Sequence, residues 1–203
     1  PTAAFEPEEL TWPRIVRRAF SDPRVPHEST GVEGRGTEEV KTNDVTGRVK
    51  AGEVGFTIEF GRPGVGVWMR EIQDMCWTLA KAGVDFETRN PITSLMKDRA
   101  TGTLREDILN EKLMSAIIEI KVPISRTEEI ICLVKDVEKR IDTVVALGVG
   151  ARCDEDGVDR KIAPVLEKLG YNLVRAKTNI GLGRNSNAVL PEHKAAQAEL
   201  VSR

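Results

Sequence analysis

The sequence predicts an α+β protein: a ferredoxin-like βαββαβ sandwich with an additional C-terminal αβ unit and an irregular N-terminal arm. Two segments in tandem each have the order strand, helix, strand, and a further helix and strand follow them. Before residue 50, closely spaced prolines and glycines limit the chain to short elements. We therefore divide the 203 residues into an arm (1–50), a ferredoxin-like domain (51–184) and a C-terminal tail (185–203) with a short helix.

The arm is expected to contain one short helix, over residues 11–20. A capping threonine and an early proline open this segment. Ile15, Val16 and Phe20 then fall toward one side of the helix. The arm holds nearly equal numbers of acidic and basic residues, unlike a tail that binds nucleic acid.

The first βαβ unit begins with a strand in which Phe56, Ile58 and Phe60 alternate with polar residues. Apolar side chains then recur at helical spacing: Trp68, Ile72, Cys76 and Leu79. Gly83 ends this helix, and residues 84–87 form a second, half-buried strand.

The second βαβ unit starts with a strand over residues 116–122 and ends with a strand over residues 144–149. The helix between them has a core stripe of four apolar residues: Ile130, Val134, Val137 and Ile141. The two units are joined by a charged insertion, residues 91–114, in which we expect a short helix over residues 105–114.

The additional C-terminal unit consists of a helix over residues 159–169 and a fifth strand over residues 172–180. Gly170 separates the two elements. Pro191 then opens the alanine-rich helix of the tail, which is expected to dock on the domain or on a neighbouring subunit.

The composition argues against two classes of partner. With 30 basic and 32 acidic residues the formal charge is −2, so no overall field attracts nucleic acid or an anionic membrane. No apolar run approaches the length of about 20 residues needed to cross a bilayer. Three scattered cysteines do not make a disulfide framework, which favours a reducing compartment and hence a cytoplasmic protein.

The segment GRPGVG is the first candidate ligand site. It contains Gly61, Arg62, Gly64 and Gly66, and Arg70 follows in the first turn of the predicted helix. A strand that leads through glycines into a helix N-terminus offers backbone N–H groups and a favourable dipole to an anion. The glycine spacing matches neither the Walker loop nor the dinucleotide fingerprint, so the interpretation as a tight turn stays open.

The segment TNIGLGR, at the end of the predicted fifth strand, is the second candidate. Gly181, Gly183 and Arg184 are suited to close over an anionic ligand. The same glycines also suit a strand end that needs positive φ. Together with GRPGVG, this segment predicts a small anionic ligand, although the sequence does not show that the two segments meet.

Catalytic and metal-binding residues are harder to identify. Cys153 follows Arg152, which favours a thiolate, but neighbouring acidic residues oppose that effect. The acidic residues 154–159 lack the order of a calcium loop, and the chain has 2 histidines, so no metal site is predicted. Cys76 and Cys132 fall on or beside apolar helical stripes and are expected in the core.

The second face of the sheet carries mixed charges rather than stacking aromatics, so we expect no RNA-binding surface there. Such a face suits solvent, a polar subunit interface, or a cleft in which Glu59 and Glu119 shift each other's pKa. Asp85 belongs to the same face. These three carboxylates, together with Cys153, are the catalytic candidates.

Three functional hypotheses follow. Because no set of acid, base and nucleophile is evident, we first expect an accessory or regulatory protein that binds a small anionic ligand or a protein partner as a homo-oligomer. The second is an enzyme that acts on an anionic small molecule, with arginine anchors and a carboxylate as general base. The third is a structural subunit of a larger complex. The sequence identifies no cofactor.

Overall fold

The computed structural model describes residues 10–22, 24–31, 33, 47–62 and 64–171 and has mixed α and β content. Its five α-helices are α1 (Ile15–Ala19), α3 (Met69–Lys81), α4 (Pro91–Ser94), α5 (Thr127–Glu138) and α6 (Ala163–Lys168). The main sheet consists of β1 (Glu53–Phe60), β3 (Asp85–Phe86), β7 (Ala116–Pro123) and β8 (Val145–Ala151). Two small sheets consist of β2 (Val67–Trp68) with β6 (Lys112–Leu113) and β4 (Met96–Asp98) with β5 (Thr103–Leu104).

The main sheet has the strand order β3-β7-β1-β8, and every neighbouring pair is antiparallel. The two predicted βαβ units are therefore interleaved: β7 lies between β1 and β3, and β1 lies between β7 and β8. The longest pairings join β1 to β7 and to β8. Two strands form the centre of the sheet, and β3 and β8 form its two edges.

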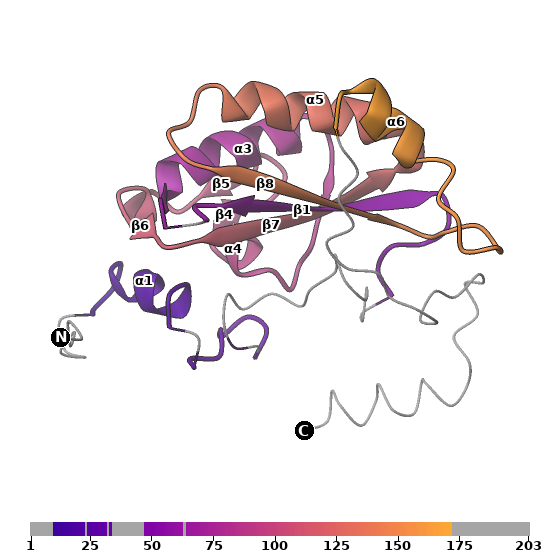
Figure 1. Ribbon diagram of the computed structural model, residues 1–203. Coiled ribbons are helices and arrows are strands. Elements are labelled where there is room, and N and C mark those ends of the chain that lie inside the picture. Colours follow the sequence, from indigo (N-terminus) through magenta and orange to yellow (C-terminus); the bar gives the residue numbers. More distant parts are fainter. Residues whose placement is uncertain (1–9, 23, 32, 34–46, 63, 172–203) are drawn as a thin grey trace, which may run out of the picture.

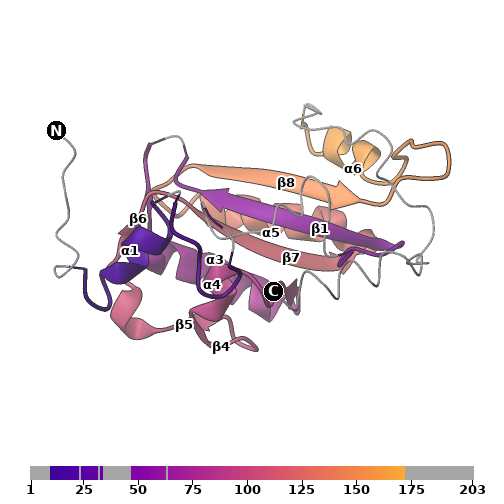
Figure 2. The same cartoon turned by 90° about the horizontal axis from the view of Figure 1, so that it is seen from below.

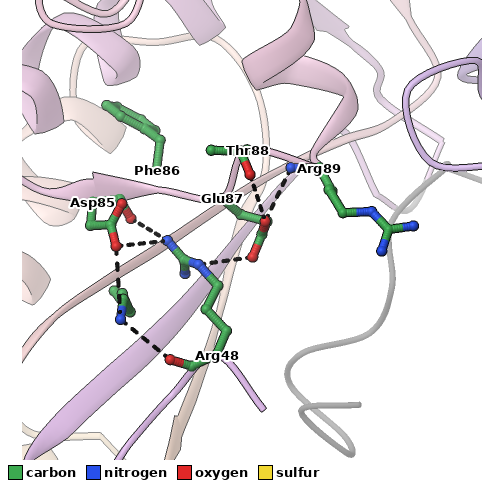
Figure 3. Close-up of a pocket in the computed structure, with 7 residues that line it drawn as sticks. Arg48, Asp85, Phe86, Glu87, Thr88 and Arg89 are labelled. Carbon is green, nitrogen blue, oxygen red and sulfur yellow. Dashed lines mark hydrogen bonds and ion pairs between the residues drawn. The ribbon is translucent and has the colours of Figure 1, made fainter. Parts of the chain in front are cut away.

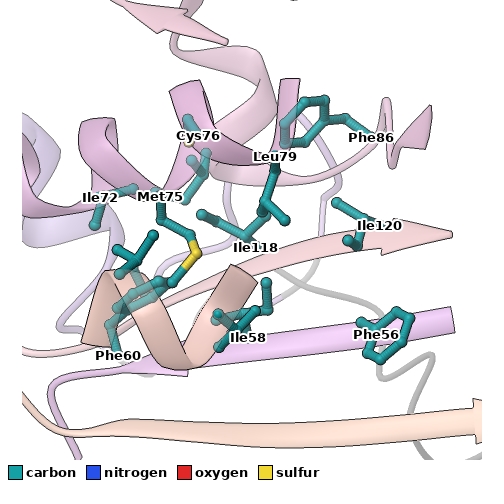
Figure 4. Close-up of a cluster of buried hydrophobic side chains, with 14 of the residues drawn as sticks. Phe56, Ile58, Phe60, Ile72, Met75, Cys76, Leu79, Phe86, Ile118 and Ile120 are labelled. Atoms are coloured by element: carbon teal, nitrogen blue, oxygen red, sulfur yellow. The ribbon is translucent and has the colours of Figure 1, made fainter. Parts of the chain in front are cut away.

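Helices α3 and α5 cover one face of the sheet, and α6 lies beside α5 on the same side (Figure 1). The core lies between this helical layer and the sheet (Figure 4). Phe56, Ile58 and Phe60 are completely buried, as their alternation predicts. From the helical layer, Ile72 and Leu79 pack against them in the same apolar cluster.

The opposite face of the sheet is covered in part by α1 and α4, which lie beneath it (Figures 1 and 2). Helix α4 contacts β7. It begins at Asn90, whose side chain accepts hydrogen bonds from the backbone N–H groups of Ile92 and Thr93, with Pro91 in the first turn. This face is therefore not the open surface that its mixed charges suggest.

The predicted helix over residues 105–114 is wrong. That segment forms a single 3-10 turn, η2 (Glu106–Ile108), followed by strand β6. Leu113 pairs with Val67 of β2, and this long-range pairing outweighs the local helical pattern. The prediction for Cys132 is also wrong, because its side chain is exposed, whereas Cys76 is buried.

The last helix in the described part of the chain is α6, and Gly170 follows it with a positive φ. The predicted fifth strand, residues 172–180, and the helix opened by Pro191 lie outside the described residues. In the part of the chain that the structure describes, no helix has both the length and the apolar character that crossing a bilayer requires.

Candidate functional site

The GRPGVG segment forms a tight corner at the end of β1. Gly61, Gly64 and Gly66 all have positive φ. The backbone N–H groups of Val65 and Gly66 donate to the carbonyl of Gly61, at 3.1 and 3.0 Å. A Cβ atom on Gly66 would lie 2.8 Å from the carbonyl oxygen of Leu113, so side chains are excluded there by packing as well as by φ.

The backbone donors at the start of α3 already have partners within the chain. The N–H groups of Met69 and Arg70 donate to the carbonyls of Glu111 and Leu109, and a carboxylate oxygen of Glu71 accepts from the N–H of Trp68. Arg62 and Arg70 are both exposed, and the Arg70 guanidinium lies 4.4 Å from the centre of the Trp68 ring. The role of this corner in anion binding stays a prediction.

The other predicted site residues are dispersed. Gly181, Gly183 and Arg184 lie outside the described residues. Cys153 is exposed in the turn after β8, and Glu59 is half-buried near the end of β1.

Asp85 is distant from the GRPGVG corner. It pairs with Lys121, which pairs in turn with Gly55 of β1. Gly61 lies six positions further along the chain, or about 20 Å at 3.4 Å per residue. The arginines of the corner and the carboxylate of Asp85 therefore do not converge on one site.

A cluster of buried polar side chains lies between α4 and the sheet, at Thr57, Asn90, Thr93 and Glu119. The centre of the cluster is Asn90, which is fully buried. Its amide donates to the carbonyl of Ile117 at 3.1 Å and to a carboxylate oxygen of Glu119 at 2.9 Å, and its side-chain oxygen caps α4. All the hydrogen-bonding capacity of this amide is used, which fixes α4 against β7.

Two hydroxyl groups in this polar cluster lack hydrogen-bond partners among the described residues. They belong to Thr57, which is 2 % exposed, and Thr93, which is 4 % exposed. Thr57 lies directly across from Glu119 in the β1–β7 pairing, and Glu119 is itself 2 % exposed. Both hydroxyls therefore belong to the buried polar surroundings of the Glu119 carboxylate.

A hollow of about 370 Å³ lies beside β3 and is lined by Arg48, Asp85, Phe86, Glu87, Thr88, Arg89 and Lys121 (Figure 3). Arg48 extends from the arm into this wall. Its Nε lies 2.8 Å from the carboxylate of Glu87, and its Nη2 donates to the backbone carbonyl of Asp85 at 2.6 Å. Arg89 extends away from the Arg48–Glu87 pair on the other side of Glu87 (Figure 3). The walls thus combine three cations with two carboxylates.

Lys121 contributes the third cation of the hollow. Its ammonium lies 2.9 Å from the carboxylate of Glu53 and 3.8 Å from that of Asp85. Burial raises the pKa of Glu53, but hydrogen bonds from the backbone N–H of Lys50 and from Lys121 outweigh that effect, so the pKa lies below its usual value. The ion pair is therefore intact at neutral pH.

Sequence reasoning missed Arg48 and Asn90. The signal for Asn90 is present, because an asparagine followed by proline, as in NPITS, is typical of the start of a helix. No local signal identifies Arg48, whose partner Asp85 lies 37 positions away in the sequence. Within the described ranges, no group of three or more His, Cys, Asp or Glu side chains is arranged to hold a metal ion.

Comparison of the chain with protein-family models, with curated proteins and with solved structures found no match.

Proposed function

We propose that this chain is an accessory or regulatory protein that binds a small anionic ligand in the hollow beside β3 and acts as a homo-oligomer. The observation that carries this proposal is the fixed guanidinium of Arg48 in the wall of the hollow. Its side chain is 12 % exposed and is held by Glu87 and by the carbonyl of Asp85. A cation held in this way loses little conformational entropy when an anion binds.

The surrounding charges define the class of ligand. Arg89 and Lys121 add cationic groups to the walls, which suits a carboxylate or a phosphate. The carboxylates of Asp85 and Glu87 pair with Arg48, and Asp85 also pairs with Lys121, so the positive charge of the walls is partly neutralised. A compact ligand that carries hydrogen-bond donors as well as an anionic group therefore fits better than a highly charged polyanion.

The test compares two arginines of the same chain. Titration calorimetry with inorganic phosphate, small carboxylates and nucleotides would first identify a binder. Arg89→Ala should then weaken its binding at least tenfold, whereas Arg62→Ala, at the exposed GRPGVG corner, should change it less than twofold. The reverse result would place the ligand at the corner, and turnover of a substrate without any stable binder would contradict the proposal.

A second candidate function is favoured by the buried carboxylate of Glu119. Glu119 accepts a hydrogen bond from Asn90 and lies across from the buried hydroxyl of Thr57, which is the setting of an acid–base group. In that case Glu119→Gln, which keeps the shape of the side chain, would abolish turnover and leave ligand affinity largely unchanged. Loss of folding without any catalytic readout would instead assign Glu119 to the structural role of holding α4.

We also propose that the fold is ferredoxin-like. The strand order β3-β7-β1-β8 supports this proposal, since two interleaved βαβ units in one antiparallel sheet define that fold. Helix α6 would be the helix of the additional C-terminal unit, and its strand stays a prediction. All three cysteines are free thiols, which supports a reducing and hence cytoplasmic location.

A further inference from the structure

We infer that β8 pairs with the β8 strand of a second copy of this chain, in an antiparallel and two-fold symmetric arrangement that continues the main sheet across both subunits. This inference rests on the homo-oligomer in the proposed function and is independent of the ligand. It is supported by the orientation of the backbone groups of β8 and by the uncharged side chains of this strand. Charged side chains, in contrast, surround β3 at the opposite edge of the sheet.

Among the described residues, the outer side of the β8 backbone has no neighbouring strand. The N–H of Gly61 donates to the carbonyl of Val144 at 3.0 Å, in the same register as the β1–β8 pairing. Hydrogen-bonded and non-hydrogen-bonded pairs alternate along an antiparallel ladder. The residues that direct their N–H and C=O groups away from β1 are therefore Val145, Leu147, Val149 and Ala151. In the described part of the chain, no strand lies on that side of β8.

The side chains of β8 do not protect this edge. Natural sheets block free edges with charged residues, proline or bulges, or keep the edge strand very short. The β8 sequence VALGVGA has seven residues, with neither charge nor proline, and its pairing with β1 is regular throughout. Leu147 and Val149 are only partly buried beside the core. Pairing with another strand would complete the burial of both.

The small residues of β8 fit close contact with a second copy. Ala146, Gly148 and Gly150 point to the face away from the core, since they alternate with Val145, Leu147 and Val149. Glycine in the interior of a strand weakens it and often marks a site where another backbone approaches closely. A Cβ atom on Gly150 would meet nothing within 4 Å, so packing within the described subunit does not require a glycine there.

One register satisfies all of the outward groups. If Gly148 lies opposite Gly148 of the second copy, Val145 faces Ala151 and Leu147 faces Val149 across the two-fold axis. Each of these outward pairs exchanges two N–H···O=C hydrogen bonds. The small residues then occupy the non-hydrogen-bonded positions, where Cα atoms are only about 4.5 Å apart. No charged side chains within β8 oppose each other.

A cysteine at the proposed two-fold axis tests the register in the full chain. Exposed Cys132 and Cys153 are first changed to serine, so that the introduced thiol is the only accessible one. Gly148→Cys should then give a disulfide-linked dimer on mild oxidation, since disulfides span Cα distances of about 4.4–6.8 Å. Ala146→Cys is the matched control and should not cross-link, because its counterpart would lie about 13 Å further along the strand.

A second pair of variants tests the edge itself. Val149→Pro removes an outward N–H and no bond to β1, whereas Val149→Ala keeps the N–H and shortens the side chain, so it reports the effect of lost side-chain contacts alone. Sedimentation analysis should give a dimer for the wild type and for Val149→Ala, and a dissociation constant at least a hundredfold higher for Val149→Pro.

The possible results separate the two proposals. A dimer that resists Val149→Pro and does not cross-link in the Gly148→Cys variant would overturn this inference but leave the homo-oligomer standing. A monomeric wild type would overturn both. In a monomeric protein, the strand predicted over residues 172–180 would be the alternative partner of β8.

Discussion

The two edges of the main sheet differ in length, charge and covering. Edge strand β3 has two residues, and only Phe86 directs its backbone groups outward, because Glu87 donates to the carbonyl of Glu119 and Asp85 pairs with Lys121. Arg48 from the arm donates to the carbonyl of Asp85 and pairs with the carboxylate of Glu87, so charged side chains surround this edge strand. Edge strand β8 has seven residues with no charge.

This difference assigns separate roles to the two sides of the sheet. Charged groups around β3 are also the walls of the polar hollow, so protection of this edge and the proposed ligand binding would use the same residues. At β8 the strand consists of small and apolar residues, and no other described strand pairs with its outer side. The following predictions test this contrast, from the largest expected effect to the smallest.

The largest effect should come from the strands on either side of Ile58. Ile118 of β7 and Leu147 of β8 both pair with Ile58, one from each side. Ile118 is completely buried, so Ile118→Ala should lower the free energy of unfolding by roughly 2–5 kcal/mol. Leu147 is only partly buried, so Leu147→Ala should cost less in the monomer.

Urea unfolding at a protein concentration below that of dimer formation measures both variants. Equal losses for the two variants at that concentration would mean that β8 is covered as completely as β7, and the contrast between the edges would fail. At higher concentration the loss for Leu147→Ala should grow, since the second subunit completes its burial.

The central strands and the helical layer could be predicted from the sequence because their patterns are local. The alternation of Phe56, Ile58 and Phe60 and the stripe through Ile72 and Leu79 each require only neighbouring residues. Their burial follows from one apolar face meeting another.

The face of the sheet opposite α3 and α5 could not be predicted in the same way, because residues distant in sequence cover it. Glu119 has the parity of a solvent-facing residue, yet it is buried and accepts a hydrogen bond from Asn90 at the start of α4. Arg48 reaches Asp85 and Glu87 from an arm whose composition indicates only irregular structure. Side chains that cross between segments leave no periodic signal in the sequence.

The second prediction tests the ion pair between Arg48 and Glu87 beside β3. Arg48→Met should lower the free energy of unfolding by about 3 kcal/mol, because it leaves the largely buried carboxylate of Glu87 without its cation. The double variant Arg48→Met with Glu87→Gln should recover most of this loss, since no unpaired charge remains. Chemical unfolding of the wild type, the two single variants and the double variant measures the coupling energy between Arg48 and Glu87. Strictly additive losses of unfolding free energy would show that the two side chains do not stabilise each other beside β3.

The third prediction concerns the GRPGVG corner, which leads from β1 into β2 and α3. Gly66→Ala should cost about 2 kcal/mol, because the new Cβ meets the carbonyl of Leu113 at a positive φ. Gly64→Ala should cost about 1 kcal/mol, since a Cβ there meets nothing and only φ is unfavourable. Arg62→Ala should change stability by less than about 0.5 kcal/mol.

Melting and ligand titration on the same preparations of these three variants separate the two roles of the corner. If the segment is only a turn, stability falls in the order given and ligand affinity does not change. A loss of affinity in Arg62→Ala at unchanged stability would instead support anion binding by the corner.

The smallest effect should be the pH dependence of stability that comes from the ion pair between Glu53 and Lys121. The pKa of Glu53 is lowered in the folded chain, so its carboxylate contributes stability above its ordinary pKa of 4.5, and this contribution is lost as the pH falls through the lower folded value. Because the Glu53–Lys121 pair is partly exposed and screened by solvent, Glu53→Gln should cost only about 0.5 kcal/mol at pH 7. The difference between wild type and variant should vanish near pH 3 and shrink in about 1 M salt. Lys121→Met is the matched control, since Glu53→Gln should have almost no effect in its background at either pH. If the difference in stability between wild type and Glu53→Gln persists at pH 3, Glu53 acts through packing and not through its ion pair with Lys121.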